Sequence, residues 1–303
     1  MLDMVSGTAL RGAGAVVGAA GEAAPLRVLI DGVQTGLVPV WDRGIGYGDG
    51  LFETVLISKG RPCQWSRHVA RLALGCGRLG IPVPSARCLE DEARPLIEGL
   101  DAGVLKVLIT RGTGGRGYRP PAQPQSRRAL LVYPLPVWPP DCCTRGLSVR
   151  YCLTRASENR SLAGIKHLNR LDNVLARAEW TDPEIAEGLM LRDDGQVVGG
   201  TMSNLFLWTG TTLDTPLLDR AGIAGTVRDL TLELAAGLGI ACRERDLRPA
   251  DLHAARGLFL TNALIGVWPV RRLDGRDYDP GLLPWGLLKA VALAAQTAEW
   301  PTP

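Results

Sequence analysis

A proline-dense segment near the middle of the chain, Pro134 to Pro140, constrains the fold more than any other sequence feature. Prolines cannot continue a helix or donate within a sheet, so such a run is typical of a connector. The 303 residues exceed the usual size of one domain, and two hydrophobic cores are therefore expected. We predict a flexible N-terminal extension over residues 1–25, a smaller α/β domain over 26–133, an interdomain link over 134–145 and a larger domain over 146–303.

The first half of the chain reads as strands and helices separated by glycine-rich loops. Asp31-Gly32 lies between Val28 to Ile30 and an apolar run to Val40, which predicts a hairpin. Leu51 to Ser58 predicts a strand, and a helix capped by Ser66 follows with apolar residues at three- and four-residue steps. Arg71 lies on this helix, where a surface charge is the simplest interpretation.

The predicted strand Val104 to Thr110 runs into a glycine-rich stretch, Arg111 to Tyr118, that formally satisfies G-x-G-x-x-G. Prolines follow at Pro120 and Pro121, where a dinucleotide-binding fold needs a helix, so we reject that interpretation. Arg111 and Arg116 remain in a loop that could bind carboxylates through paired hydrogen bonds or could simply be solvated.

In the second half, Lys166 stands out as one of very few lysines, set among apolar and small residues in Ala163 to Arg170. The stretch predicts a strand-to-helix junction. A lone lysine is a surface charge in most sequences. The alternative is a Schiff-base amine, which an apolar site activates by lowering the pKa.

Two further stretches bear on a binding site. A hairpin over Asp193-Asp194-Gly195 leads into a tight loop, Gly199 to Asn204, ahead of another strand. Ala221 to Arg228 then enters a helix, and its Gly225-Thr226 could present backbone N–H groups and a hydroxyl to an anion. An ordinary helix start has the same pattern.

Composition excludes several classes. A formal net charge of +3 over this length argues against a nucleic-acid surface. Seven cysteines without a C-x-x-C pair, and three histidines, make a metal site improbable and favour reduced thiols in the cytoplasm. The sequence contains no run of about 18 apolar residues, so it predicts no membrane-spanning helix.

Taken in order, the motifs match a known family. They are Asp42-Arg43-Gly44, Tyr47 to Thr54, His68 to Leu72, Arg111 to Tyr118, the Lys166 stretch, Asn204-Leu205-Phe206 and Asn262-Ala263-Leu264. From about Leu26 to its end, the chain resembles the fold-type IV pyridoxal-phosphate-dependent enzymes, which include branched-chain and D-amino-acid aminotransferases and aminodeoxychorismate lyases. The Arg111 and Lys166 stretches favour the lyases.

The resemblance implies a two-domain α+β / α/β fold of the D-amino-acid aminotransferase type, with pyridoxal 5'-phosphate between the domains of a homodimer. It implies conversion of 4-amino-4-deoxychorismate to 4-aminobenzoate and pyruvate in folate biosynthesis. Lys166 would bind the cofactor covalently and transfer the proton, and Thr54 would assist protonation of the departing enolpyruvate. The residues implied to bind the cofactor phosphate are Arg71, Thr226, Val227 and Ala263. Arg111 and Arg116 would orient the substrate carboxylates.

One position departs from the family pattern. A glutamate of the family precedes the loop ending in Asn-Leu-Phe and pairs with the pyridine nitrogen, whereas the corresponding residue here is Gly199. Glu187, Asp193 and Asp194 lie nearby, and the sequence alone assigns none of them to that contact. Three interpretations stay open: a lyase in which aromatisation compensates for a weaker electron sink, an aminotransferase acting on D- or branched-chain amino acids, and a non-catalytic cofactor-binding or partner-binding homologue.

Overall fold

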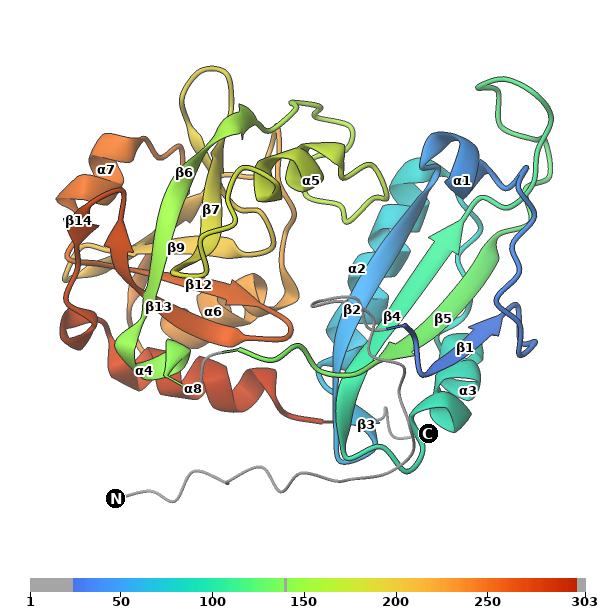
Figure 1. Ribbon diagram of the computed structural model, residues 1–303, viewed down its shortest axis with the longest axis horizontal. Helices are drawn as coiled ribbons and strands as arrows, with labels where there is room; N and C mark the ends of the chain where they lie inside the picture. The colour runs from blue at the N-terminus through green and yellow to red at the C-terminus, as the bar shows by residue number, and fades with distance from the viewer. Residues whose placement is uncertain (1–23, 139–140, 299–303) are drawn as a thin grey trace.

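The computed structural model describes residues 24–138 and 141–298, which form two sheets with their helices (Figure 1). Most of the predicted extension over 1–25 lies outside the described residues, as do Pro139 and Pro140 of the predicted link. One sheet ends at Tyr133 and the other begins at Leu147. The domain boundaries drawn from the sequence stay a prediction. Within the described ranges, every helix is too short or too polar to cross a membrane.

The first sheet has five strands in the order β1-β5-β4-β2-β3, and all neighbours are antiparallel. The strands are β1 (Arg27–Ile30), β2 (Gly50–Ser58), β3 (Arg61–Pro62), β4 (Ala102–Thr110) and β5 (Arg127–Tyr133). Strand β2 alternates, so that Leu51, Val55 and Ile57 enter the core while Phe52 and Thr54 lie on the other face.

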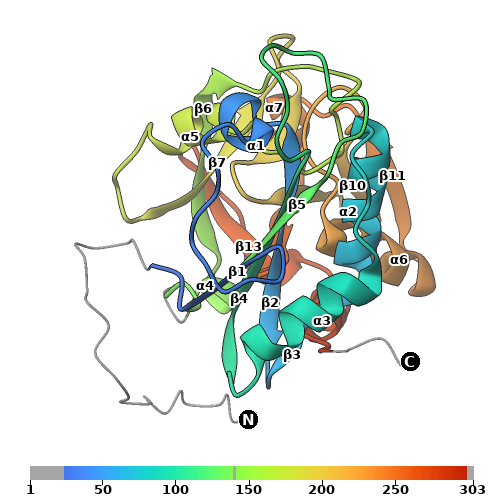
Figure 2. The ribbon, with the colours of Figure 1, turned by 90° about the vertical axis from the view of Figure 1, so that its right-hand side faces the viewer.

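Helices α2 (Trp65–Leu79) and α3 (Ala86–Ile97) cover the core face of this sheet (Figures 1 and 2). On α2, Leu72 and Cys76 are buried one turn apart, and Gly80 ends the helix in the left-handed conformation at φ 63°. The short helix α1 (Arg43–Tyr47) precedes β2, and Asp42 caps it by accepting a 2.8 Å hydrogen bond from Gly44 N.

The second sheet is mixed and has nine strands in the order β11-β10-β9-β12-β13-β6-β7-β8, with β14 beside β13. The strands are β6 (Leu147–Arg155), β7 (Ile185–Leu191), β8 (Val197–Gly200), β9 (Asn204–Trp208), β10 (Thr212–Pro216), β11 (Ala241–Arg245), β12 (Gly257–Asn262), β13 (Gly266–Leu273) and β14 (Arg276–Asp277). The predicted hairpin over Asp193-Asp194-Gly195 is confirmed as β7 and β8.

Apolar side chains pack on both faces of this sheet. The remaining helices are α4 (Cys142–Arg145), α5 (Leu171–Arg177), α6 (Thr226–Gly237), α7 (Pro249–Ala254), the 3-10 helix η1 (Pro280–Leu282) and α8 (Trp285–Ala295). Helices α6 and α8 bury one face around Phe206 and Phe259, whose rings stack at 5.0 Å. Leu205 and Leu260 point to the opposite core, under α7. The α6 N-terminus is thereby fixed against β9 and β12.

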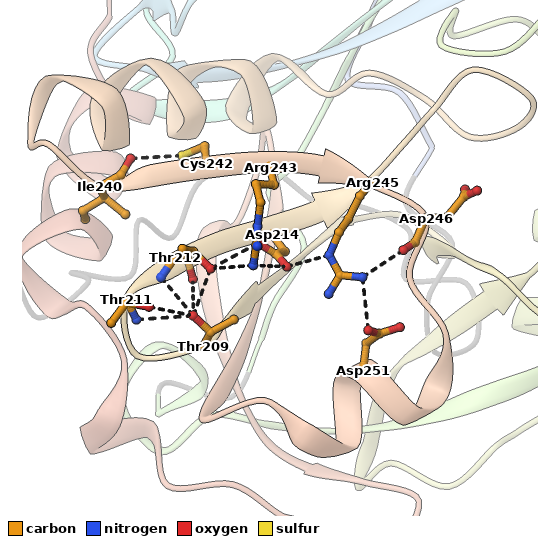
Figure 3. Close-up of polar contacts among 10 residues, drawn as sticks. All are labelled: Thr209, Thr211, Thr212, Asp214, Ile240, Cys242, Arg243, Arg245, Asp246 and Asp251. Carbon is orange, nitrogen blue, oxygen red and sulfur yellow. Dashed lines mark hydrogen bonds and ion pairs between the residues drawn. The ribbon is translucent and has the colours of Figure 1, made fainter.

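A buried carboxylate ties the edge strand β11 to its neighbour β10 (Figure 3). Asp214 is fully buried and accepts hydrogen bonds from Arg243 Nε at 2.8 Å and Arg245 Nε at 2.7 Å. Burial alone would raise the pKa of Asp214, but the two arginines outweigh that effect and hold the pKa below its usual value.

Three local predictions are wrong. The run to Val40 forms no strand: pairing after the Asp31-Gly32 turn is limited to the bridge between Ile30 and Val33, and Val40 is exposed. Helix α2 is capped by Gln64, one residue before Trp65, and not by Ser66. The helix expected to open at the Lys166 stretch begins only at Leu171, because the backbone around Lys166 pairs with β2.

Candidate active site

A cavity of about 720 Å³ lies between the two sheets. Its walls come from β2, from α2, from the segment before α5, from β8 and the following loop, from the start of α6 and from the turn after β12. The lining residues include Phe52, Thr54, Arg71, Lys166, Arg170, Asn173, Val198, Gly199, Gly200, Asn204, Arg220, Gly225, Thr226, Asn262 and Ala263. A cavity of this size, mostly apolar with a few polar groups, is the usual form of a small-molecule site.

Lys166 lies on an extended segment held from both sides. Phe52 N donates to Lys166 O at 3.0 Å, and Gly164 N donates to Gly222 O at 3.0 Å. The Lys166 Nζ lies 4.1 Å from the centre of the Phe52 ring. Burial, followed by the positive charge of Arg71, lowers the pKa of Lys166 to about 7. A large fraction of this amine is therefore neutral and nucleophilic near neutral pH.

Arg71 is fixed at the cavity wall by a buried carboxylate. Arg71 Nε and Nη2 donate to Glu53 at 2.8 and 2.5 Å, and Nη1 donates to Ala224 O at 2.9 Å. On its other side, Glu53 Oε2 lies 2.7 Å from His68 Nδ1. Burial would raise the pKa of Glu53, but the charge of Arg71 and the His68 contact lower it to about 2. Glu53 is therefore ionised and holds the guanidinium in one orientation.

The N-terminus of α6 opens into the same cavity. Gly225 and Thr226 line it, and the Thr226 side chain is buried with no hydrogen-bond partner for Oγ1 among the described residues. A buried, unpartnered hydroxyl is costly unless a ligand satisfies it. Asn204 Nδ2 fixes the preceding turn by donating to Ile223 O at 2.8 Å. With Arg71 close by at Ala224, this corner fits a phosphate group.

Of the remaining residues that the resemblance implies, two line the cavity and one packs in the core: Ala263 and Val227 for the phosphate, and Thr54 for the proton transfer. Ala263 lines the cavity in the turn after β12. The Val227 side chain packs in the core beneath α6, so that Val227 could reach a ligand only through its backbone. Thr54 lines the cavity from the same face of β2 as Phe52.

Arg111 is placed away from the cavity lining of the described residues. Its Nε and Nη2 donate to the two carboxylate oxygens of Asp49 at 2.7 and 3.0 Å. Its Nη1 and Nη2 also donate to Gly80 O and Leu79 O, each at 2.8 Å. The guanidinium thus joins the end of α2 to the loop before β2.

Arg116 lies in an exposed loop, also outside the cavity lining of the described residues. Within one copy of the chain, the structure does not bring Arg111 and Arg116 together with Lys166. Their substrate contacts stay a prediction.

Gly199 lies in the cavity wall with a φ of +153°, and the Glu187 carboxylate lies close to the next residue, Gly200. Glu187 on β7 is 1% exposed and accepts hydrogen bonds from Gly188 N, Thr201 N, Met202 N, Thr201 Oγ1 and Ser203 Oγ. A Cβ on Gly200 would lie 2.6 Å from Glu187 Oε2. Glu187 therefore shapes the loop over residues 200–203 from behind.

Sequence reasoning assigned no role to Glu53, and it placed Glu187 near Gly199 without assigning it a contact. Glu53 and Glu187 each occupy an inward position on a strand whose other inward residues are apolar. A charged residue at such a position is rarely buried unless it is paired. A glutamate at an inward position of an otherwise apolar strand therefore predicts a buried polar network, but it does not identify the residues that pair with the glutamate.

Comparisons with known proteins agree with this geometry. The family described as amino-transferase class IV matches residues 50–273. The chain is 34% identical to the aminodeoxychorismate lyase of Vibrio harveyi over 248 residues, covering 82% of this chain and 92% of that protein. It is 30% identical to a putative branched-chain-amino-acid aminotransferase of Methanocaldococcus jannaschii, covering 79% and 83%. Among solved structures, the 4-amino-4-deoxychorismate lyase of Pseudomonas aeruginosa is 44% identical with a TM-score of 0.84, covering 87% and 97%.

Proposed function

The chain belongs to the amino-transferase class IV family, and from that membership we propose a specific reaction. The protein is a pyridoxal-phosphate-dependent lyase that converts 4-amino-4-deoxychorismate to 4-aminobenzoate and pyruvate. The observation that carries the proposal is Lys166, a lysine of lowered pKa in a cavity with a phosphate-binding corner. The similarity to two proteins named as this lyase selects the substrate.

The residues present fit pyridoxal phosphate at both of its anchor points. The unpartnered Thr226 hydroxyl, the α6 N-terminus and Arg71 suit the phosphate. Lys166 supplies the amine that binds the aldehyde, and Lys59, Lys106 and Lys289 are not among the described residues that line the cavity. When bound, pyridoxal phosphate supplies an electron sink that stabilises negative charge at the carbon bearing the substrate's amino group.

The neutral amine of Lys166 is the base of the reaction. It accepts the proton from C4 of the substrate ring, and the electron pair left behind expels the enolpyruvyl oxygen as the ring becomes aromatic. The departing enolpyruvate takes up a proton to become pyruvate. We assign delivery of that proton to the hydroxyl of Thr54, which lines the cavity on the same strand face as the Phe52 ring beneath Lys166.

Gly199 favours the lyase over the aminotransferase alternative. An aminotransferase must return the amino group without any gain of aromaticity, and it therefore depends more strongly on a protonated pyridine ring. The two carboxylates among the described lining residues, Glu158 and Asp172, are engaged by Arg220 Nη2 at 2.5 Å and by Ser157 N at 2.8 Å. A non-catalytic homologue would have no use for the lowered pKa of Lys166.

We further propose that the enzyme is a homodimer in the cytoplasm. Large apolar side chains are exposed on α1 and on the loops near it: Leu37, Val40, Trp41, Ile45 and Tyr118. Such a surface is typical of a protein interface. All seven cysteines are free thiols, which suits a reducing compartment. Light scattering should give twice the 32.4 kDa chain mass, and a monomer would contradict the dimer.

The test of function is product formation without an amino acceptor. Purified protein supplied with pyridoxal phosphate and 4-amino-4-deoxychorismate should release 4-aminobenzoate and pyruvate in equal amounts over many turnovers. Lys166→Ala should lose this activity. Turnover that requires an added 2-oxo acid would identify an aminotransferase, and absence of any turnover in protein with bound cofactor would favour the non-catalytic alternative.

A further inference from the structure

Three arginines are among the described residues that line the cavity, and they differ in their partners. Arg71 is paired with Glu53 at 2.5 Å. Arg220 is paired with Glu158 at 2.5 Å and with Asp194 at 3.3 Å. For Arg170, no carboxylate lies within ion-pair distance in the part of the chain that the structure describes. Among these three arginines, Arg170 is therefore the one without an ion pair within the described residues.

The two side chains that contact Arg170 are neutral, while the charges of Asp172 and Lys166 act on it from farther away. Its Nη2 contacts the ring of His167, and its Nη1 lies 3.5 Å from Asn173 Oδ1, a weak hydrogen bond. Burial, followed by the charge of Arg170, lowers the pKa of His167 to about 4, so the imidazole carries no charge at neutral pH. The nearest acid in sequence, Asp172, accepts a hydrogen bond from Ser157 N at 2.8 Å instead.

The guanidinium is also poorly solvated. Arg170 is part-buried, and its Nε is enclosed without a hydrogen-bond partner among the described residues. Burial lowers the pKa of Arg170, with Asp172 opposing that effect in part. Removing a cation from water without a counter-ion is costly, and an incoming anion recovers that cost. The planar fork of donors, whose Nη1 makes only the weak contact with Asn173, matches a carboxylate.

We propose that Arg170 binds a carboxylate of the substrate. The proposal rests on the proposed function, because 4-amino-4-deoxychorismate carries one carboxylate on its ring and another on its enolpyruvyl group. Arg170 follows Lys166 by four residues on a segment pinned to β2, so a carboxylate held by Arg170 orients the substrate relative to the reactive amine. The phosphate corner at Thr226 is built from other residues, which leaves Arg170 for the substrate.

The test compares Arg170→Gln with two controls, Arg170→Lys and Arg160→Gln. Chorismate serves as the probe, because it has the same two carboxylates but a hydroxyl where the substrate has its amine, so it binds without reacting. The Kd for chorismate is measured by calorimetry on the cofactor-loaded protein. The Kd for pyridoxal phosphate and the melting temperature report on the integrity of each variant.

We expect Arg170→Gln to raise the Kd for chorismate and the KM for the substrate about 10- to 100-fold, the usual loss for a charged hydrogen bond. Arg170→Lys, which keeps the charge and loses the fork, should lie between Arg170→Gln and the wild type. Arg160→Gln should change the Kd for chorismate by no more than about twofold, since Arg160 is exposed, is not among the described lining residues and pairs with Asp219 at 3.1 Å. The Kd for pyridoxal phosphate should stay unchanged in all three.

The opposite results would overturn the proposal. An unchanged Kd for chorismate in Arg170→Gln, or no chorismate binding by the wild type, would exclude a substrate carboxylate at Arg170. Weaker binding of pyridoxal phosphate with unchanged chorismate binding would assign Arg170 to an oxygen of the cofactor ring. Chorismate binding that depends on Arg170 in a protein without lyase turnover would contradict the proposed function and leave this inference standing.

Discussion

Thr201 donates both its backbone N–H and its hydroxyl to the same oxygen of Glu187, at 3.0 and 2.5 Å. Glu187 thereby holds the loop over residues 200–203 against the back of the cavity wall that contains Gly199. A buried carboxylate with several charge-assisted hydrogen bonds makes a loop rigid as long as every partner is present. The shape of this wall therefore depends on a buried side chain that is not itself among the described lining residues.

Glu187→Gln should destabilise the protein and weaken cofactor binding. An amide nitrogen would face backbone N–H donors, which leaves a buried donor unsatisfied and costs about 1–3 kcal/mol. The melting temperature should fall by several degrees, measured by calorimetry, and the Kd for pyridoxal phosphate should rise. Glu184→Gln is the matched control, because Glu184 is exposed and its contact with Arg271 is 3.4 Å long. Equal melting temperatures for both variants would contradict this role of Glu187.

The lowered pKa of Lys166 predicts how cofactor capture depends on pH. Only the neutral amine attacks an aldehyde, and with a pKa of about 7 the neutral fraction grows as the pH rises through that value. The rate of pyridoxal phosphate uptake by apoprotein should therefore rise between about pH 6 and 8 and then level off. Stopped-flow absorbance of the bound cofactor measures this rate. A rate that keeps rising towards pH 10 would indicate a lysine with an ordinary pKa.

Thr226→Val should weaken phosphate binding while leaving the fold intact. The substitution preserves shape and removes a hydroxyl that has no partner within the described residues, so folding loses no hydrogen bond that the structure shows there. The Kd for pyridoxal phosphate should rise about 10-fold or more, as expected for a lost hydrogen bond to a charged group. Thr226→Ser keeps the hydroxyl and should bind nearly as well as wild type. Equal affinities for all three proteins would remove Thr226 from the phosphate site.

Because Gly199 offers no carboxylate to the pyridine nitrogen, the protein should bind a cofactor analogue that lacks this nitrogen. An analogue of pyridoxal phosphate with C–H in place of the ring nitrogen loses no carboxylate contact at this position. Its Kd should therefore stay within about threefold of the Kd for the natural cofactor, a much smaller change than the loss of one charged hydrogen bond would cause. Equilibrium dialysis against apoprotein measures both values. A loss of affinity of about 30-fold or more would show that another group of this chain pairs with the ring nitrogen. Gly199→Glu is a poorer test, because at φ +153° a side chain is strained and its Cβ would lie 3.0 Å from Ser203 O.

The sequence predicted what depends on local pattern. Lys166 could be singled out because a lysine among small and apolar residues is unusual, and Thr226 because glycine followed by threonine at a helix start exposes donors. Both line one cavity in the structure. Arg71 was predicted only through resemblance, since nothing in its helix shows that Glu53 and Ala224 fix it at the wall.

What the sequence could not show depends on distant partners. Arg111 lies in a glycine-rich stretch typical of a ligand-binding loop. In the structure its donors are occupied by Asp49, Leu79 and Gly80. Those contacts exist only after the loop packs against α2. The partner of β1 could not be predicted for the same reason, because β1 pairs with β5 from far along the chain. Pairing between distant segments is not encoded in a short window.

The most direct measurement locates the amine that binds the cofactor. Wild-type protein is incubated with pyridoxal phosphate, reduced with borohydride and digested, and the modified peptide is identified by mass spectrometry. The phosphopyridoxyl group should be found on Lys166 at about one equivalent per chain, and substrate added before reduction should prevent the modification. A label on Lys59, Lys106 or Lys289 at comparable levels, or a label on Lys166 that substrate does not displace, would contradict the assignment of this cavity as the active site.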